Sequence, residues 1–235
     1  MTRPAPPAPD PGAARRFFDA IAPRYDRTYA PSRDESRRKM ERVLAKLPPR
    51  ATILDLGVGT GRELPALLDA GHVPTGVDFS EEMLAICARR ARPIPLVHAD
   101  FWEPLPFEAG TFDAVLALHG TLAHPRSAAD AANLVRSVGR LLRPGGRFVF
   151  ELPSPRWVEE LGVNVPGVAD REVVASISRD GVTYVDRPSG ARIAAVVEDE
   201  ATWRGRFDRD AWSDVEVDTA DPFEMMFTAT KRERE

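Results

Sequence analysis

The sequence predicts an α/β fold in which a mostly parallel sheet is covered by helices on both faces. Short apolar strands alternate with amphipathic helices between Thr52 and Glu151, which is the pattern of right-handed strand–helix–strand units. The first of these strands runs into a turn with glycines at positions 57, 59 and 61, and this turn opens a helix. Beyond Pro153 the alternation stops, and short segments joined by hairpin-type turns follow.

Two helices are expected ahead of the first strand, over Arg15–Ala22 and Ser32–Leu47, with Pro23 and Pro31 breaking up the segment between them. The elements expected between residues 52 and 151 follow in the order that builds a parallel sheet. They are strand Thr52–Leu56, helix Arg62–Ala70 ended by Gly71, strand Thr75–Asp78, helix Glu81–Ala91 capped by Ser80, strands Leu96–Ala99 and Phe112–Leu118, helix Ser127–Leu142 and strand Arg147–Glu151.

Antiparallel strands are expected in the last third of the chain. Turn signals at Asp180-Gly181 and Pro188-Ser189-Gly190 separate three of them, and two more precede the charged C-terminal residues. These strands are Glu172–Ser178, Thr183–Asp186, Ile193–Val197, Val215–Asp218 and Glu224–Thr230.

The length and the charge of the chain narrow the classes of function. Its 235 residues suffice for one compact domain with a substantial core. The formal net charge of −4 gives no overall field that would recruit nucleic acid or an anionic membrane. The first fifty residues hold twelve Lys/Arg against six Asp/Glu, but these charges alternate in sign on helical patterns and are expected to form a solvated face.

Residues 1–14 are expected to form a disordered tail, because five prolines fall within the first twelve residues and no apolar core segment is present. Neither a signal peptide nor a membrane anchor is therefore expected, and no apolar run approaches the ~20 residues of a spanning helix. The expected location is cytoplasmic. The single cysteine, Cys87, excludes an intramolecular disulfide and a cysteine-based zinc cluster. It is expected in the core, and no metal site is expected.

The glycine turn after the first strand is the first candidate binding site. Three glycines at a spacing of two, Gly57, Gly59 and Gly61, let the backbone approach a ligand, and the following helix presents free N–H groups there. A nicotinamide or flavin fingerprint requires its third glycine where Arg62 stands. Asp55, two residues before the first glycine, suits a ligand with an ammonium group and would repel a pyrophosphate. The alternative is a mere tight turn.

Two further acidic residues stand at the ends of the next two strands. Asp78 ends the second strand, where an acid can accept hydrogen bonds from both hydroxyls of a ribose; the alternative is a helix cap, although Ser80 is better placed for that. Asp100 follows the third strand and can accept from an adenine amino group while the Phe101 N–H donates to the ring; the alternative is a plain loop acid. Open α/β sheets bind ligands at the carboxyl ends of their strands, so one shared site is expected.

In this order, the motifs resemble the class I S-adenosylmethionine-dependent methyltransferases. The resemblance covers Phe17 to Glu151 and Val215 to Thr230. It includes Gly110-Thr111-Phe112-Asp113-Ala114-Val115 at the fourth strand and Leu141-Leu142-Arg143-Pro144-Gly145-Gly146-Arg147 before the fifth. The segment Phe18-Asp19-Ala20-Ile21-Ala22-Pro23-Arg24-Tyr25-Asp26 is similar to the opening of the C-methyltransferases of ubiquinone and menaquinone biosynthesis and their small-molecule relatives.

The resemblance implies a three-layer Rossmann-like methyltransferase fold with a seven-stranded sheet of order 3-2-1-4-5-7-6, in which strand 7 is antiparallel. It implies S-adenosyl-L-methionine as the cofactor, residues 15–50 as a helical lid and residues 51–235 as the binding domain. Tyr25 would lie near the methionine part of the cofactor, with core packing as the alternative. The cofactor-binding residues that the resemblance implies are Tyr25, Asp55, Gly57, Gly59, Gly61, Asp78, Phe79, Met83, Asp100, Phe101, Leu118 and His119.

One segment departs from this template. Arg171–Asp199 is expected to form an antiparallel β-hairpin insertion in place of the usual crossover helix between strands five and six. It either roofs the acceptor pocket, covers an edge as a flap, or forms the subunit contact of a homodimer.

Two histidines after the fourth strand are candidate catalytic bases. A methyl group on a sulfonium is already activated, so its transfer needs positioning and a free lone pair, and a base only where the acceptor is a hydroxyl. His119 at the strand end is preferred over His124. For either residue the alternative is a hydrogen bond to loop backbone. Arg126 is either a surface charge or a ligand for an acceptor carboxylate.

The loop after the fourth strand limits the class of methyl acceptor that is expected. Leu118-His119-Gly120-Thr121 stands where enzymes that methylate nucleobase amino groups place an Asn/Asp-Pro-Pro-aromatic tetrad. The paired glutamates of protein-arginine enzymes and the cysteine of cytosine C5 enzymes are missing there. The expected function is methyl transfer to an O, N or C atom of a small-molecule acceptor. The alternatives are a catalytically silent cofactor-binding scaffold or regulatory subunit and, less favoured because of Arg62, a nicotinamide-dependent oxidoreductase.

Overall fold

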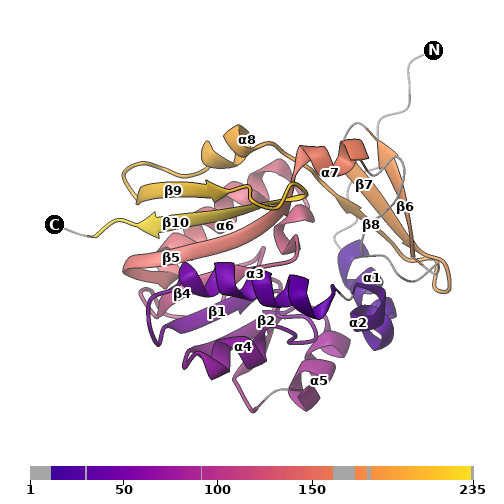
Figure 1. Cartoon of the computed structure of the whole chain (residues 1–235), viewed down its shortest axis with the longest axis horizontal. Helices are drawn as coiled ribbons and strands as arrows, with labels where there is room; N and C mark the ends of the chain where they lie inside the picture. The colour runs from indigo at the N-terminus through magenta and orange to yellow at the C-terminus, as the bar shows by residue number, and fades with distance from the viewer. Residues whose placement is uncertain (1–11, 30, 91, 161–172, 179–180, 234–235) are drawn as a thin grey trace.

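The structure, a computed structural model, describes residues 12–29, 31–90, 92–160, 173–178 and 181–233. A seven-stranded sheet forms the middle layer, helices pack on both of its faces, and a separate three-stranded sheet lies beside the N-terminal helices (Figure 1). The predicted α/β class is therefore confirmed. Most of the predicted tail, residues 1–11, and the predicted turn residue Asp180 lie outside the described residues.

The strands of the large sheet follow the order β3-β2-β1-β4-β5-β10-β9. Neighbours from β3 to β5 are parallel, and β10 runs antiparallel to both β5 and β9. Counted without the insertion, this is the predicted order 3-2-1-4-5-7-6 with strand 7 antiparallel. The strands are β1 (Thr52–Leu56), β2 (Val73–Asp78), β3 (Leu96–His98), β4 (Phe112–Ala117), β5 (Leu142–Pro153), β9 (Trp212–Asp218) and β10 (Glu224–Lys231).

Alternate side chains of the central strands supply the cores on the two faces of the sheet. Ile53 of β1 packs with apolar residues of α3, α4 and α5 on one face. Leu54 and Leu56 pack with α6 and α8 on the other face. Because both faces are covered, the buried residues of β1 and β4 are mostly apolar, as the sequence pattern suggested. The covering helices are α3 (Arg33–Ala45), α4 (Leu64–Asp69), α5 (Glu81–Arg90), α6 (Ala128–Leu141) and α8 (Glu200–Arg204).

The N-terminal segment stays helical through Pro23, where a break was predicted. Proline falls in the first turn of a 3₁₀ helix, where its missing N–H removes no hydrogen bond of the helix. The chain therefore turns tightly and brings two aromatic side chains, Phe18 and Tyr25, to the same side. The elements here are α1 (Ala13–Ile21), η1 (Ala22–Arg24) and α2 (Tyr25–Thr28).

Several short helices were not predicted, among them η2 (Thr121–Ala123), α7 (Pro155–Glu160) and α8. Since α8 precedes β9, the prediction that the insertion replaces the crossover helix is wrong: a short helix remains. The Asp199 carboxylate caps it by accepting from the Thr202 N–H at 2.8 Å. Its Trp203 is buried, 5.1 Å from the Phe150 ring. A helix this short shows no apolar periodicity in the sequence. The packing of Trp203 therefore stabilises it in the folded protein.

The predicted insertion is an antiparallel sheet of β6 (Val173–Ser178), β7 (Gly181–Asp186) and β8 (Arg192–Ala195). It lies against the N-terminal helices (Figure 1), where Ile193 packs with α1. The Arg24 guanidinium of η1 forms an ion pair with the buried carboxylate of Asp186. None of the helices in the described ranges is long and apolar enough to cross a membrane.

Candidate functional site

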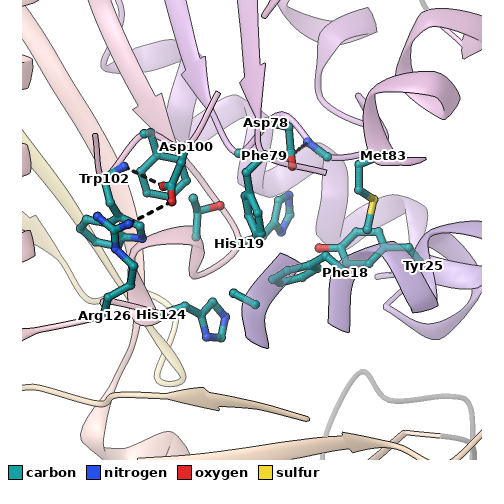
Figure 2. Close-up of a pocket in the computed structure, with 15 residues that line it drawn as sticks. Phe18, Tyr25, Asp78, Phe79, Met83, Asp100, Trp102, His119, His124 and Arg126 are labelled. Atoms are coloured by element: carbon teal, nitrogen blue, oxygen red, sulfur yellow. Dashed lines mark hydrogen bonds and ion pairs between the residues drawn. The ribbon is translucent and has the colours of Figure 1, made fainter. Parts of the chain in front are cut away.

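A pocket opens between the carboxyl ends of the central strands and the N-terminal helices (Figure 2). It encloses about 720 Å³ of empty space, open solvent at its mouth included. A smaller pocket adjoins it. Residues that line both are Tyr25, Gly57, Gly59, His119 and Thr121.

The fold brings the predicted site residues together, with one exception. Gly61 lines neither pocket. The predicted residues that line one or both are Tyr25, Asp55, Gly57, Gly59, Asp78, Phe79, Met83, Asp100, Phe101, Leu118, His119 and His124. Within the described ranges, no group of three or more His, Cys, Asp or Glu side chains could hold a metal ion.

The glycines of the turn after β1 differ in what surrounds them. A Cβ on Gly57 would meet Cγ2 of Thr121 at 2.6 Å, and a Cβ on Gly61 would meet Sγ of Cys87 at 2.6 Å. A Cβ on Gly59 would meet nothing closer than 3.9 Å. Gly57 and Gly61 therefore allow close packing inside the protein, while Gly59 leaves the turn open toward the pocket.

Asp78, at the end of β2, is fixed against the glycine turn. Its carboxylate accepts hydrogen bonds from the N–H groups of Gly59 at 2.8 Å and Ser80 at 2.9 Å. Burial raises the pKa of Asp78 to about 6, although these N–H groups favour the ionised form. The Ser80 hydroxyl caps α5 by accepting from the Met83 N–H at 3.1 Å. Capping therefore falls to Ser80, as expected, and the Asp78 carboxylate lines the larger pocket.

Asp55, at the end of β1, lies deeper and borders the smaller pocket. The whole residue is only 6% exposed. Burial, and then the charges of Glu63 and Asp78, raise the pKa of Asp55 well above its ordinary value. No residue in the described ranges donates a hydrogen bond to its carboxylate. A buried carboxylate without a partner is costly, so the site suits a ligand that brings a cationic group.

Asp100, after β3, already has partners within the protein. Its carboxylate accepts from the Trp102 N–H at 3.0 Å and lies 3.4 Å from Nη1 of Arg126. The Arg126 guanidinium also binds Glu103 at 2.8 Å, and the Arg126 N–H donates to Asp130 at 2.8 Å. Arg126 therefore lines the pocket with its charge compensated by neighbouring acids.

Phe18 of α1 and Tyr25 of α2 line the larger pocket, so the N-terminal helices form part of the site (Figure 2). The Phe18 ring lies 6.0 Å from Phe79 and 5.8 Å from His124, edge-on to both. The Arg62 guanidinium lies 5.3 Å from the centre of the Tyr25 ring. Burial raises the pKa of Tyr25, so its hydroxyl stays protonated. Tyr25 packs against the buried cluster that includes Phe17 and Ile21 of α1, and it also borders both pockets.

His119 follows Leu118 at the end of β4. Its backbone is left-handed, with φ of 57°, a conformation that costs a residue other than glycine on the order of 1–3 kcal/mol. The His119 N–H donates to the buried Glu151 carboxylate at 2.9 Å. Its Nε2 lies 2.5 Å from Oε1 of Glu63. Although burial opposes it, this histidine holds the pKa of Glu63 down at about 2.

His124 is attached to the insertion. Its Nδ1 donates to the carbonyl oxygen of Ala194 in β8 at 2.8 Å, so Nε2 of the neutral ring carries no proton. Burial lowers the pKa of His124 and keeps the ring neutral. The hydrogen bond to backbone that was the alternative for this residue is present, and the ring still lines the larger pocket.

Some lining residues were not predicted as site residues. Glu63 follows the glycine turn, where an acid is visible in the sequence, but its partner His119 stands 56 residues further on. Phe18 lies in the segment that carries the family resemblance. The lining residues absent from the prediction are Ala14, Phe18, Val58, Thr60, Arg62, Glu63, Trp102, Thr121 and Arg126, of which Arg126 had been considered as an acceptor ligand.

Comparison with known proteins identifies the family that the sequence motifs resemble. The profile described as methyltransferase domain matches residues 53–146. A demethylmenaquinone methyltransferase of Mycolicibacterium vanbaalenii is 32% identical over 217 residues, which cover 88% of this chain and 89% of that protein. A demethylmenaquinone methyltransferase of Thermus thermophilus is 37% identical over 152 residues, which cover 59% of this chain and 66% of that protein.

Solved structures share the fold. The complex of DhpI with SAH has a TM-score of 0.70 at 23% identity and covers 94% of this chain and 97% of that one. The CcbJ methyltransferase of Streptomyces caelestis has a TM-score of 0.71 at 20% identity and covers 92% and 98%. The chain is therefore a class I S-adenosylmethionine-dependent methyltransferase and belongs to the family that includes the demethylmenaquinone methyltransferases.

Proposed function

We propose that this pocket binds S-adenosylmethionine and that the chain transfers the methyl group to a small-molecule acceptor beside His119. One observation carries the proposal. Asp55 and Asp78 stand at the ends of the neighbouring strands β1 and β2, Asp100 follows β3, and all three border the two adjoining pockets. In open α/β sheets this edge is where ligands bind.

Each carboxylate suits a different part of the cofactor. Asp55, buried without a partner in the described ranges, suits the ammonium group of the methionine part. Asp78, held by the Gly59 N–H, suits the ribose hydroxyls. Asp100 and the backbone N–H of Phe101 suit the adenine. The walls around them would come from Tyr25, Phe79, Met83 and Leu118. The residues present thus fit the cofactor.

When bound, S-adenosylmethionine supplies a methyl group on a sulfonium, which needs no further activation. The protein then has to orient the acceptor, exclude water and, for a hydroxyl acceptor, take up a proton. Two histidines line the pocket for this task. We assign the base role first to His119 and second to His124, whose Nδ1 is already committed to Ala194.

We propose an aromatic acceptor of the phenol or quinol class. Phe18, Phe79 and Trp102 offer aromatic surface in the larger pocket. The relatives named demethylmenaquinone methyltransferases support an acceptor of this class. The charge of Arg126 is taken up by neighbouring acids, so an anionic acceptor is less favoured.

Three finer predictions belong to this proposal. The first is a cytoplasmic location. The second is that nucleic acid is not a partner, which the net charge of −4 supports. The third concerns the 171–199 insertion. Its contacts with α1 and His124 favour a roof over the acceptor site, and the alternatives are a flap that covers an edge and a homodimer contact.

Calorimetric titration with S-adenosylhomocysteine tests the cofactor assignment. Asp78→Ala is expected to weaken binding on the order of 100-fold, since two charge-assisted hydrogen bonds of roughly 1.5 kcal/mol each would be lost. Asp69→Ala is the matched control, because Asp69 is exposed and pairs with Arg92 on the surface. Equal affinities for Asp78→Ala and wild type would remove Asp78 from the site.

Turnover needs a separate experiment. The protein is incubated with methyl-labelled cofactor and a metabolite extract, and transfer of label to a small molecule supports the proposal. Binding of S-adenosylhomocysteine without any transfer would instead indicate a silent scaffold. A thermal-shift comparison of NADH with S-adenosylhomocysteine tests the oxidoreductase alternative.

A further inference from the structure

His119 and Glu63 form a hydrogen-bonded pair in the smaller pocket. Nε2 of the ring lies 2.5 Å from Oε1, and the two side chains are 21% and 17% exposed. Glu63 stands at the start of α4, directly after the glycine turn, whereas His119 follows β4. The two residues meet because β1 and β4 are neighbours in the sheet.

The pair determines which ring nitrogen carries the proton. A carboxylate only accepts, so Nε2 is the donor and Nδ1 keeps the lone pair in the neutral ring. No residue in the described ranges donates to Nδ1. Because His119 lines both pockets, its basic nitrogen is left for a ligand bound there.

The backbone of His119 is fixed as well. Its left-handed conformation is held by the hydrogen bond from its N–H to Glu151 at 2.9 Å. The Glu151 carboxylate is itself buried and forms an ion pair with the Lys39 ammonium at 3.2 Å. The backbone that carries the ring is therefore held independently of Glu63, and what Glu63 adds is the orientation of the ring.

We propose that Glu63 is a positioning residue that holds His119 as the general base for a hydroxyl acceptor, an inference that rests on the proposed function. The acceptor proton passes to Nδ1 of His119 as a lone pair of the oxygen forms the new bond to the methyl carbon. The electrons of the broken carbon–sulfur bond stay on sulfur. The positive charge lost there appears on the imidazolium, where the Glu63 carboxylate stabilises it.

Other charged and titratable groups surround the pair. Among the residues that the structure describes, only Glu63 contacts the ring with a charged atom, and Nε of Arg62 approaches Oε1 of Glu63 to 3.9 Å. Removing the Glu63 charge is therefore expected to dominate any change in the titration of the ring. The other groups around the pair are Tyr25 of α2, Lys39 of α3, Asp55 of β1, Arg62 of the turn, Glu151 of β5 and Glu224 of β10.

An NMR experiment tests the pair without any acceptor. Two-bond ¹H–¹⁵N spectra of the full chain report the ring tautomer, and His119→Asn assigns the signal. We expect the Nε2–H form in the wild type and titration of the ring at lower pH in Glu63→Gln. Glu41→Gln, an exposed glutamate paired with Arg37, should leave the titration unchanged. A neutral ring protonated on Nδ1, or the same titration in Glu63→Gln as in the wild type, would overturn the proposal.

Kinetics test the role in transfer, with 1,4-dihydroxynaphthalene kept under argon as the acceptor probe. We expect kcat of Glu63→Gln to fall about a hundredfold, with the affinity for S-adenosylhomocysteine nearly unchanged. The acidic limb of its pH profile should move to lower pH, and Glu63→Asp, which keeps the charge, should recover part of the rate. A wild-type kcat in Glu63→Gln would sink the positioning role alone. A wild type that binds no S-adenosylhomocysteine would instead sink the proposed function, and the NMR result would still decide the pair.

Discussion

The thiol of Cys87 lies so close to Gly61 that a Cβ on this glycine would come within 2.6 Å of Sγ. Gly61 also has a positive φ, of 73°. Burial raises the pKa of Cys87 to about 11, so the thiol stays neutral and packs as a small apolar group. The contact joins the glycine turn to α5 and explains why Gly61 does not line the pocket.

Gly61→Ala is therefore expected to destabilise the protein by about 3 kcal/mol, from overpacking and from the left-handed backbone together. Gly110→Ala is the matched control, because Gly110 has φ of 67° but nothing within 4 Å of its Cβ position. It should cost only about 1 kcal/mol. Urea unfolding followed by circular dichroism measures both, and equal losses would refute the packing argument.

The buried ion pair between Arg24 and Asp186 should stabilise the attachment of the insertion. The Asp186 side chain is 0% exposed and that of Arg24 is 15% exposed. Arg24→Met is expected to lower the free energy of unfolding by about 3 kcal/mol, because it leaves a buried carboxylate uncompensated. Asp186→Leu should do the same, and the double variant should lose less than the sum.

Denaturant titrations of the four proteins give the coupling energy of this pair. The exposed pair of Arg37 and Glu41 on α3 is the reference, for which about 0.5 kcal/mol is expected. A coupling energy for Arg24 and Asp186 no larger than this reference would contradict the prediction.

The affinity for S-adenosylhomocysteine should depend on pH through Asp78. Burial raises the pKa of Asp78 to about 6, and only the ionised carboxylate can accept two hydroxyl hydrogen bonds. The dissociation constant is therefore expected to rise as pH falls below 6, by up to about tenfold per pH unit. Asp78→Asn should bind more weakly with a smaller slope, the remainder coming from Asp55. Calorimetry between pH 5 and 8 checks this, and identical slopes would count against the assignment.

The Asp78 carboxylate affects the stability of the ligand-free protein in the opposite direction: its contribution to the free energy of unfolding falls as pH rises. The folded pKa of Asp78 lies above the ordinary value of 3.8, so the ligand-free folded protein binds the proton more tightly than the unfolded chain. Its contribution to stability is therefore largest at low pH and declines as pH rises from about 4 to about 6. The unfolding free energies of wild type and Asp78→Asn should diverge across this window.

The two histidines should separate in their effects on turnover. His119→Asn is expected to lower kcat for a hydroxyl acceptor by about 100-fold or more, since the base is lost. His124→Asn should lower it by less than about tenfold, because an asparagine amide can still donate to the Ala194 carbonyl. Steady-state kinetics with both variants checks the order. A larger loss in His124→Asn would make His124 the base.

Part of the site was readable because it depends on local features. The bounds of β1 were predicted correctly, since a short apolar strand before a glycine turn has few alternatives. Asp55, Asp78 and Asp100 each stand at or just beyond the end of a strand, and the carboxyl ends of parallel strands share one edge. Their convergence on one site was therefore expected from this shared edge, together with the strand order that the family resemblance implies.

Other parts depend on contacts between distant residues. α8 is stabilised by the packing of Trp203 against Phe150. The short sequence of the helix does not by itself predict this contact. Arg24 and Asp186 are 162 residues apart in the chain. Any arginine of the first fifty residues could have paired with a distant acid, so no local pattern singles out this one.

The sequence by itself determined the class of fold, the order of the strands through its family motifs, and the acids at the strand ends. The class of fold and the positions of the acids follow from periodicity and glycine turns, which are properties of neighbouring residues, whereas the order of the strands was implied by the family resemblance. Only the tertiary structure decided that Glu63 meets His119, that His124 is tied to Ala194, and that Gly61 packs against Cys87. Such contacts join segments far apart in the chain, and packing in three dimensions selects them from many combinations that the sequence allows equally.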